Sequence, residues 1–300
     1  MTTCPYCQNL SSYYFTIVSR NFYRCLTCDL IHQNLENSYN ETVATYRENY
    51  FDRHSADETE GQRDRLYDHI LKLIARNSEI HGVRRLLDVG TGCGFFLVAA
   101  KRSQWATKGV EPSIQSVEVA RRHNNLDVLH GTLAEFDENG QFEVITFINV
   151  LDHSAMPWLE IDRARKLLCP GGLIYIRFPN GLLHSLLYRI AKRCGLSTSL
   201  RKFLVFHSYS FTPMYIKKLL HDKGFVRVTV LNSLPSDGDP HNLFRNPTLA
   251  FYIKRLLYLL ATAARSLSTS HILLGTSLEV IAVKRTAQHL APPIGTPSTN

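Results

Sequence analysis

The chain has 300 residues, a formal net charge of +8 and hydrophobic residues at 44% of its positions. This length allows a large buried core, and the ordinary globular composition excludes a disordered chain or a small fold held by disulfides. Seven cysteines without an N-terminal apolar signal region indicate a reducing compartment, so we expect a cytoplasmic protein. The positive charge is concentrated, because neither residues 163–221 nor residues 240–278 contain Asp or Glu.

Two Cys-x-x-Cys pairs, Cys4/Cys7 and Cys25/Cys28, begin the chain and are separated by 17 residues. Four thiolates on two tight turns form a closed tetrahedral site, as is typical of structural zinc. We therefore predict a zinc ribbon over residues 1–33. A redox dithiol and a degenerate site are the alternatives.

The ribbon is poorly suited to nucleic acid. Only Arg20 and Arg24 are cationic before Arg47, too few for a phosphate-binding face. We expect no nucleic-acid partner, and a ribbon that holds a substrate lid or an N-terminal extension in place.

Residues 34–80 are predicted to form a linker and helix in front of the next domain, with the helical apolar spacing confined to residues 63–77. Aromatic side chains in the linker would stack on a cofactor or pack on the core: Tyr39, Tyr46, Tyr50 and Phe51.

A short apolar run over residues 85–89 predicts a buried parallel strand, and an apolar helix is predicted to follow up to about Arg102. Gly90, Gly92 and Gly94 form the turn between them. Glycine allows a sharp turn and a close approach to a ligand, and the amides of a helix N-terminus favour negative charge. A turn that merely packs helix on strand is the structural alternative.

Glu111 lies at the end of the next strand, 17 residues after Gly94. An acid at about this distance holds the ribose diol in nucleotide-binding α/β folds. Phe95 and Phe96 stand where a dinucleotide fingerprint needs its last glycine, which argues against NAD. The pattern favours another adenosine derivative.

The segment from Asp88 to Glu111 resembles motif I of class I S-adenosylmethionine-dependent methyltransferases. The resemblance implies a doubly wound, seven-stranded Rossmann-like α/β sheet. Asp88 would then lie near the methionine end of the cofactor, Glu111 would bind the ribose, and Thr132 and Leu133 would lie along the adenine. The expected cofactor-binding residues are Asp88, Gly90, Thr91, Gly92, Gly94, Glu111, Thr132, Leu133 and Asn149.

A strand over residues 142–148 brings residues 149–153 to the carboxyl edge of the sheet, where open α/β folds bind ligands. His153 is a candidate general base for a substrate hydroxyl, because its ordinary pKa is near neutral; capping of the next helix is the alternative. Some quinone-pathway O-methyltransferases resemble this segment but have a metal site of two Glu and one His. Since Asn149 replaces the first Glu, we do not expect a metal at Asp152 and His153.

A helix over residues 158–168, a Pro-Gly-Gly break and a strand over residues 173–178 also match the methyltransferase fold. We predict that this domain occupies residues 81–285, interrupted by insertions at residues 181–210 and 232–276. The further predicted elements are a helix at 216–222, strands at 225–231 and 277–283, a helix at 249–267 in the second insertion, and a disordered tail at 286–300.

Both insertions contain basic, apolar helices on the substrate side of the sheet. Neither is long enough to span a membrane. They are expected to form a lid or, alternatively, to lie on an anionic membrane surface at its inner face. His207 and Tyr209 are candidate catalytic residues that reach the substrate from this lid, with packing as the alternative.

The expected activity is direct methyl transfer. The cysteine motif and the segment around His207 resemble methyltransferases of sugar and surface-glycan pathways, which implies an anionic small-molecule acceptor such as a sugar or phosphorylated glycan precursor. An O-methyltransferase of a quinone or phenol is the first alternative. A non-catalytic, zinc-stapled binding module is the second.

Overall fold

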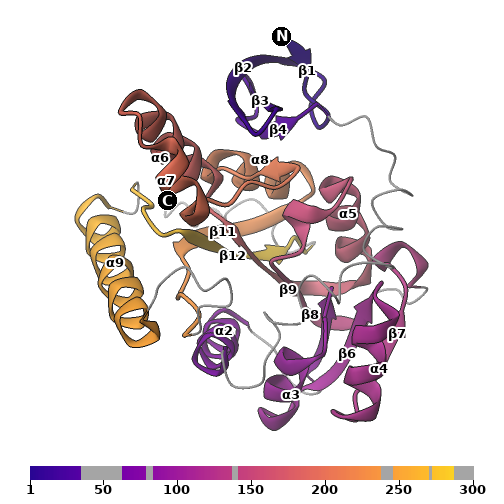
Figure 1. The fold of residues 1–300 in the computed structure, drawn as a ribbon. Coiled ribbons are helices and arrows are strands. Elements are labelled where there is room, and N and C mark those ends of the chain that lie inside the picture. The colour runs from indigo at the N-terminus through magenta and orange to yellow at the C-terminus, as the bar shows by residue number, and fades with distance from the viewer. Residues whose placement is uncertain (35–62, 79–83, 137–140, 238–245, 270–271, 287–300) are drawn as a thin grey trace, which may run out of the picture.

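The computed structural model describes residues 1–34, 63–78, 84–136, 141–237, 246–269 and 272–286 (Figure 1). The predicted linker aromatics and nearly all of the predicted tail lie outside these residues. The described part contains a seven-stranded sheet and a smaller five-stranded sheet.

The seven-stranded sheet has the order β11-β12-β9-β8-β5-β6-β7. Strands β5 to β9 pair in parallel, while β12 runs antiparallel between β9 and β11. This topology confirms the predicted doubly wound α/β fold. The strands are β5 (Arg85–Val89), β6 (Ala106–Glu111), β7 (Val128–His130), β8 (Phe142–Ile148), β9 (Leu168–Pro179), β11 (Phe225–Asn232) and β12 (Ser277–Lys284).

Helices cover both faces of this sheet (Figure 1). Leu86 and Leu87, adjacent in β5, belong to the two opposite cores, because successive side chains of a strand point to opposite faces. One core contains apolar residues of α2, α3 and α4, and the other contains those of α5 and α8. The helices are α2 (Asp64–Asn77), α3 (Phe95–Arg102), α4 (Ile114–Arg122), α5 (Pro157–Leu167) and α8 (Pro213–Asp222), with short 3₁₀ turns η2 (Leu133–Glu135) and η3 (Leu151–His153).

Strand β9 begins at Leu168, earlier than the predicted Leu173. Leu168 already pairs with Phe142 of β8, and the register then shifts before Leu173 pairs with Val144. Gly171 takes a positive φ of 74° at this irregularity. The Pro-Gly-Gly sequence is therefore a break inside the strand and not a loop before it.

Helix α8 begins at Pro213, three residues before the predicted Ile216. Thr212 caps it by accepting a hydrogen bond of 3.1 Å from the amide of Tyr215. Threonine at this position and proline in the first turn are both favoured at helix starts. The cap therefore sets this boundary, ahead of the apolar spacing.

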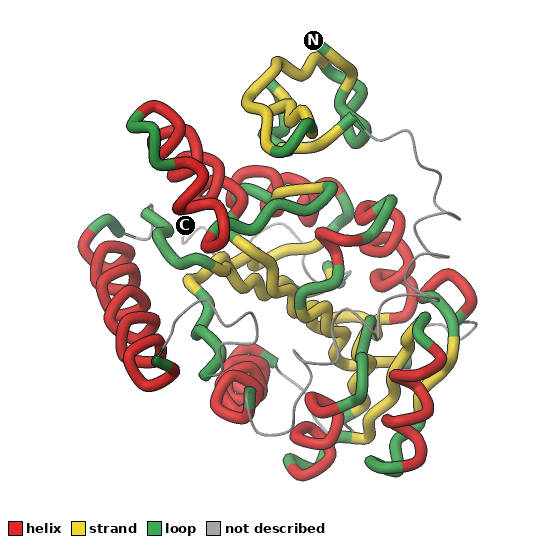
Figure 2. The backbone as a smooth tube through the Cα atoms, in the orientation of Figure 1, coloured by secondary structure: helices red, strands yellow, loops and turns green. Residues whose placement is uncertain are grey.

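The N-terminal strands lie together at the top of Figure 2 and form most of the smaller sheet. Its last strand comes from the first insertion, because β4 pairs antiparallel with β10. Tyr209 is opposite His32 in this pair, and Ser210 is opposite Ile31. The strands are β1 (Thr2–Thr3), β2 (Leu10–Ile17), β3 (Arg20–Cys25), β4 (Ile31–Gln33) and β10 (Tyr209–Ser210).

The insertions are helical. The first contains α6 (Gly181–Arg193), α7 (Ser197–Leu200) and the 3₁₀ turn η4 (Arg201–Phe203), and the second contains α9 (Pro247–Leu267). Among the described residues, no helix combines the length and apolar character needed to cross a membrane.

His184 makes stability sensitive to acid. Its side chain is buried, its Nε2 lies 2.9 Å from the carbonyl oxygen of Thr276, and burial lowers its pKa. The unfolded chain therefore binds the proton more tightly. The contribution of neutral His184 to the free energy of unfolding should be fully present above the ordinary histidine pKa of about 6.5. It should be lost as the pH falls below that value.

His184→Gln keeps a donor for Thr276 without titrating near neutral pH. We expect denaturant unfolding of this variant to depend less on pH between about 5 and 7 than that of the wild type. His123→Gln, at an exposed position, is the control. Equal slopes for His184→Gln and the wild type would contradict the assignment.

Candidate functional site

The turn between β5 and α3 has the geometry that its glycines predict. Gly90, Gly92 and Gly94 have φ values of 67°, 56° and 84°. A Cβ on Gly90 would lie 2.6 Å from Val150, and one on Gly94 would lie 2.3 Å from Leu126. Larger residues at Gly90 and Gly94 would thus be both strained and crowded.

Glu111 lies against the same turn. Its carboxylate is buried and accepts hydrogen bonds of 2.9 Å from the amides of Gly92 and Ser113. The end of β6 is thereby fixed to the turn after β5. A negative charge lies where the sequence predicts a ribose acceptor.

Two further polar groups of the turn fit a polar cofactor. Asp88 is buried and its Oδ1 accepts a hydrogen bond of 2.6 Å from Thr146. The hydroxyl of Thr91 is buried and has no partner among the described residues, and no side chain caps the first amides of α3. Unsatisfied buried donors are costly, so this set fits a ligand with acceptors and a polar tail.

Thr132 and Leu133 follow β7 as expected, but only one of them offers its side chain. Leu133 is 1% exposed and packs in the core, whereas Thr132 is half-buried and donates a hydrogen bond of 3.4 Å to Glu135. A ligand at this turn would meet Thr132 and the backbone more readily than the Leu133 side chain. The predicted contact between Leu133 and adenine is left as a prediction.

Asn149 follows β8 in an unusual conformation, with a φ of 59°. Its backbone amide donates to the Arg177 carbonyl at 2.9 Å, and its side-chain Oδ1 accepts from Arg177 Nη1 at 2.6 Å. Arg177 is buried, and burial lowers its pKa. An asparagine in the left-handed region and a buried cation thus meet at the carboxyl edge, where the sequence predicts a ligand.

Asp152, His153 and His207 form a cluster at the same edge. Nε2 of His207 lies 3.4 Å from Asp152 Oδ2, Nε2 of His153 lies 4.0 Å from it, and the two imidazole centroids are 3.8 Å apart. The two histidine side chains are 24% and 28% exposed. The cluster thus places two partly exposed imidazoles beside a buried carboxylate.

The Asp152 carboxylate is 2% exposed, and neither of its oxygens has a hydrogen-bond partner among the described residues. A buried charge needs compensation by a nearby positive group. Protonation of either histidine would supply it. The same three side chains offer ligand atoms within 4.8 Å of one another, so a divalent cation would supply it as well.

Tyr209 does not join this cluster through its hydroxyl. The hydroxyl donates a hydrogen bond of 2.8 Å to the Ala155 carbonyl, and the ring packs edge-on against Trp158. Burial raises the pKa of Tyr209 to about 12. This placement favours the packing role over the predicted catalytic role.

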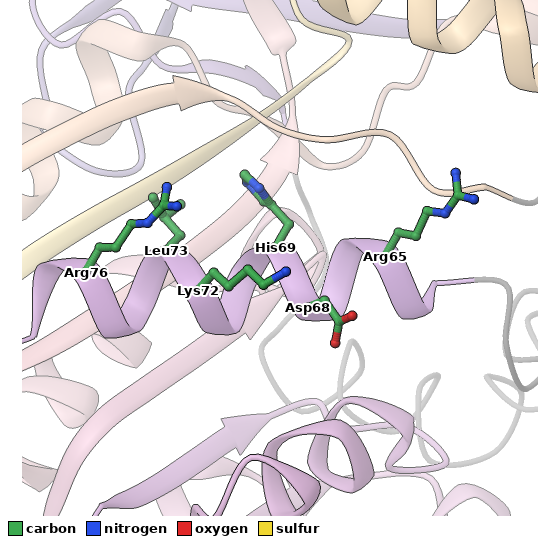
Figure 3. Close-up of a pocket in the computed structure, with 6 residues that line it drawn as sticks. All are labelled: Arg65, Asp68, His69, Lys72, Leu73 and Arg76. Carbon is green, nitrogen blue, oxygen red and sulfur yellow. The ribbon is translucent and has the colours of Figure 1, made fainter.

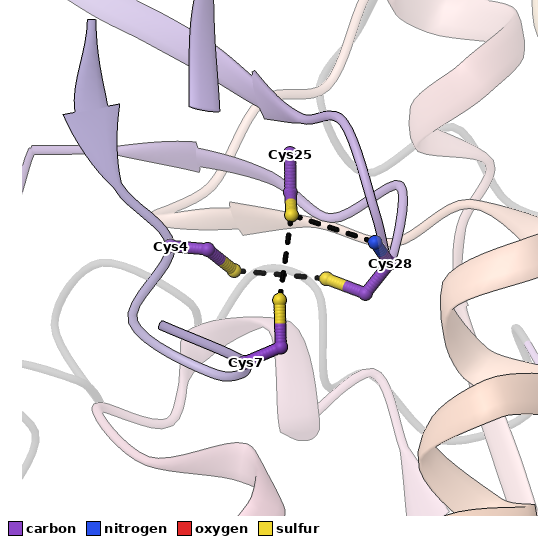
Figure 4. Close-up of side chains that lie close together, drawn as sticks. All are labelled: Cys4, Cys7, Cys25 and Cys28. Carbon is purple, nitrogen blue, oxygen red and sulfur yellow. Dashed lines mark hydrogen bonds between the residues drawn. The ribbon is translucent and has the colours of Figure 1, made fainter. Parts of the chain in front are cut away.

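The four predicted cysteine ligands converge on one point (Figure 4). Sγ of Cys4 is 3.6 Å from Sγ of Cys28, and Sγ of Cys7 is 3.5 Å from Sγ of Cys25. A tetrahedral site with zinc–sulfur bonds of about 2.3 Å has sulfur–sulfur edges of about 3.8 Å. Both separations are close to this value, and the donor set fits zinc.

The ribbon places His207 in the cluster. The backbone amide of Gln33 donates to the Ser208 carbonyl at 3.1 Å, and the side-chain amide of Gln33 donates to the His207 carbonyl at 3.2 Å. Next to His207, Phe206 packs against Phe15 and Phe22 of the ribbon. The segment around His207 is therefore held by the N-terminal sheet on both sides of the histidine.

Asp152 and Arg177 were not assigned roles from the sequence. The position of Asp152 beside His153 was a usable signal, and so was a single arginine within the apolar run of β9.

A separate cavity of about 300 Å³ lies along α2 (Figure 3) and contains no residue of the glycine turn or the cluster. It is lined by Arg65, Asp68, His69, Lys72, Leu73 and Arg76.

Comparison with known proteins gives the class of this fold and site. A model of the methyltransferase domain family matches residues 59–230, more than half of the chain, and the chain therefore belongs to this family. In solved structures, the fold is similar to a methyltransferase from Archaeoglobus fulgidus (18% identity, TM-score 0.51, 79% of this chain and 100% of that chain). It is also similar to magnesium protoporphyrin IX methyltransferase from Synechocystis (14%, 0.52, 83% and 100%).

Curated relatives give a more particular likeness. The chain is 26% identical over 157 residues to ubiquinone biosynthesis O-methyltransferase of Psychrobacter arcticus, covering 49% of this chain and 61% of that protein. It is 30% identical over 95 residues to the protein of that name from Nitrobacter winogradskyi, covering 30% and 36%. The chain thus spans about three fifths, or less, of these relatives. They give no support to the expected glycan-pathway resemblance.

Cys25→Ser should release zinc and destabilise the ribbon, because three thiolates no longer close the site. The thermal midpoint should fall, while cofactor affinity stays close to that of the wild type because the glycine turn is remote in the fold. Metal content and calorimetric unfolding check both effects. Cys194→Ser, at an exposed cysteine, is the control, and undiminished zinc in Cys25→Ser would rule the site out.

Proposed function

We propose that this protein is an S-adenosylmethionine-dependent O-methyltransferase that acts on a small quinol or phenol-type acceptor and carries one structural zinc ion in its ribbon. The observation that carries this proposal is the cluster of Asp152, His153 and His207 at the carboxyl edge that also bears the glycine turn. Family membership and the O-methyltransferases among the relatives support it.

The glycine turn and Glu111 provide the cofactor site in this proposal. S-Adenosylmethionine, when bound, supplies an electrophilic methyl group on sulfur. Glu111 binds the ribose hydroxyls, Asp88 faces the methionine end, and the uncapped amides of α3 and the Thr91 hydroxyl bind polar groups of the ligand. The protein's task is then to align the acceptor oxygen with the methyl group.

The acceptor hydroxyl must lose a proton as its bond to carbon forms and the carbon–sulfur bond breaks. His153 or His207 accepts that proton. The buried Asp152 carboxylate, 3.4 Å from His207 and 4.0 Å from His153, stabilises the imidazolium that results. The proton passes to histidine, and the electron pair of the broken carbon–sulfur bond stays on sulfur.

The proposed acceptor, a quinol or phenol, differs from the glycan precursor that the charge distribution predicts. A phenol has a hydroxyl that one histidine can deprotonate, and it fits a site bordered by the apolar insertions. Methylation of a catechol or quinol without methylation of nucleotide sugars would support the proposal. The reverse preference would favour the glycan reading.

His153→Asn and His207→Asn test the base. The variant that loses the base should show kcat reduced by roughly 10²–10⁴-fold, with cofactor affinity changed little, and Asp152→Asn should lower kcat through loss of the compensating charge. The methyl-transfer rate with a catechol acceptor and calorimetric binding of S-adenosylhomocysteine are the measurements.

His123→Asn, an exposed substitution away from the edge, is the matched control. If all three cluster variants retain wild-type kcat, the histidines have no catalytic role. A strict requirement for added Mg²⁺ or Mn²⁺ would assign the cluster to a metal in place of a base.

Glu111→Ala should weaken binding of S-adenosylhomocysteine by roughly 1–3 kcal/mol, because the charge-assisted hydrogen bonds to the ribose are lost. Calorimetric titration measures the change. Glu118→Ala on α4, whose carboxylate is half-exposed, is the control. Equal affinity in Glu111→Ala and wild type would remove Glu111 from the cofactor site.

A further inference from the structure

Helix α9 carries an apolar stripe that the described structure does not cover. The stripe follows one side of the helix at intervals of three, four, four and seven residues, and each member is more than half exposed. Its members are Leu249, Tyr252, Leu256, Leu260 and Leu267. Beside the stripe, Ala250 and Ala261 are buried, and the Ala261 carbonyl accepts a hydrogen bond of 2.8 Å from Asn232 at the end of β11.

The first insertion continues this surface with apolar and basic groups. Leu186, Leu187 and Ile190 of α6 are between 43% and 52% exposed. Exposed cations follow them in the sequence: Lys192, Arg193, Arg201 and Lys202.

The two insertions are tied together. Nε2 of His184 in α6 lies 2.9 Å from the Thr276 carbonyl, and the side chain of Asn180 donates to the carbonyls of Leu273 and Gly275 at 3.1 and 3.0 Å. Residues 273–276 follow α9 in the chain and lead into β12. Both helices lie toward the same edge of the molecule in Figure 1.

The charge on this surface has one sign. Neither residues 163–221 nor residues 240–278, which contain both helices, include an Asp or Glu. A second copy of the chain would bring like charges together, whereas an anionic bilayer attracts the cations and buries the leucines. At 1.5 Å per residue, the 21 residues of α9 would lie along the bilayer for about 30 Å.

We propose that α9 and the segment from α6 to η4 form a docking surface for an anionic membrane. The stripe of α9 enters the headgroup region, and the cations of α6 and η4 bind lipid phosphates. The protein then lies on the membrane without crossing it, and acceptors dissolved in the bilayer reach the adjoining site along this face.

Sedimentation of the full-length protein with vesicles tests the proposal. We expect binding to phosphatidylcholine vesicles that contain phosphatidylglycerol, weak binding to phosphatidylcholine alone, and loss of binding at high salt. Lys192→Glu combined with Arg193→Glu should weaken binding by about tenfold or more, and Leu256→Ser combined with Leu260→Ser should also weaken it.

Matched controls distinguish binding by this surface from nonspecific binding through charged or apolar side chains elsewhere. Lys101→Glu with Arg102→Glu reverses two exposed cations of α3, and Leu10→Ser with Leu159→Ser removes two half-exposed leucines. Both controls should bind like wild type. Equal binding by the surface variants and the wild type, no preference for phosphatidylglycerol, or a dimer that the α9 variant abolishes in sedimentation velocity would overturn the proposal.

Discussion

The pairing of β4 with β10 is the constraint on which the candidate site depends. Residues 31 and 210 are far apart in the chain, yet their strands share one sheet, and this pairing carries His207 to Asp152 and His153. The aromatic packing of Phe15, Phe22 and Phe206 supports the same contact. The predicted cofactor-binding residues come from the large domain alone, whereas the cluster of Asp152, His153 and His207 needs the ribbon as well.

The local elements of the site are readable from sequence because strand, turn and helix follow one another directly. Gly90, Gly92 and Gly94 predict their own positive φ values, and the position of Glu111 follows from the length of one β-α-β unit. His153 is likewise placed by the rule that parallel strands end at one edge of the sheet. In these cases a short sequence contains all the information that the geometry requires.

The remainder depends on contacts between distant segments. Nothing local to His207 or Tyr209 indicates that β10 adds to the N-terminal sheet. Their roles are decided by contacts with distant residues, because the hydroxyl of Tyr209 donates to Ala155 and His207 lies beside Asp152. The partnership of Asn149 with Arg177 has the same origin, because it joins two strands. The start of β9 was misplaced for a related reason, since a Pro-Gly-Gly sequence that usually ends an element here lies within a strand.

The shared sheet also orders events during synthesis. The ribbon cysteines leave the ribosome before the residues of the large sheet, and β1, β2, β3 and β4 can pair as soon as residue 33 is made. The outer edge of β4 then has to wait for roughly 175 more residues before β10 exists, and closing so long a loop is slow compared with local folding. A metal bound early would hold the unpaired edge in shape during that interval, so zinc supply would govern the yield of correctly assembled chains as well as the stability of those already complete.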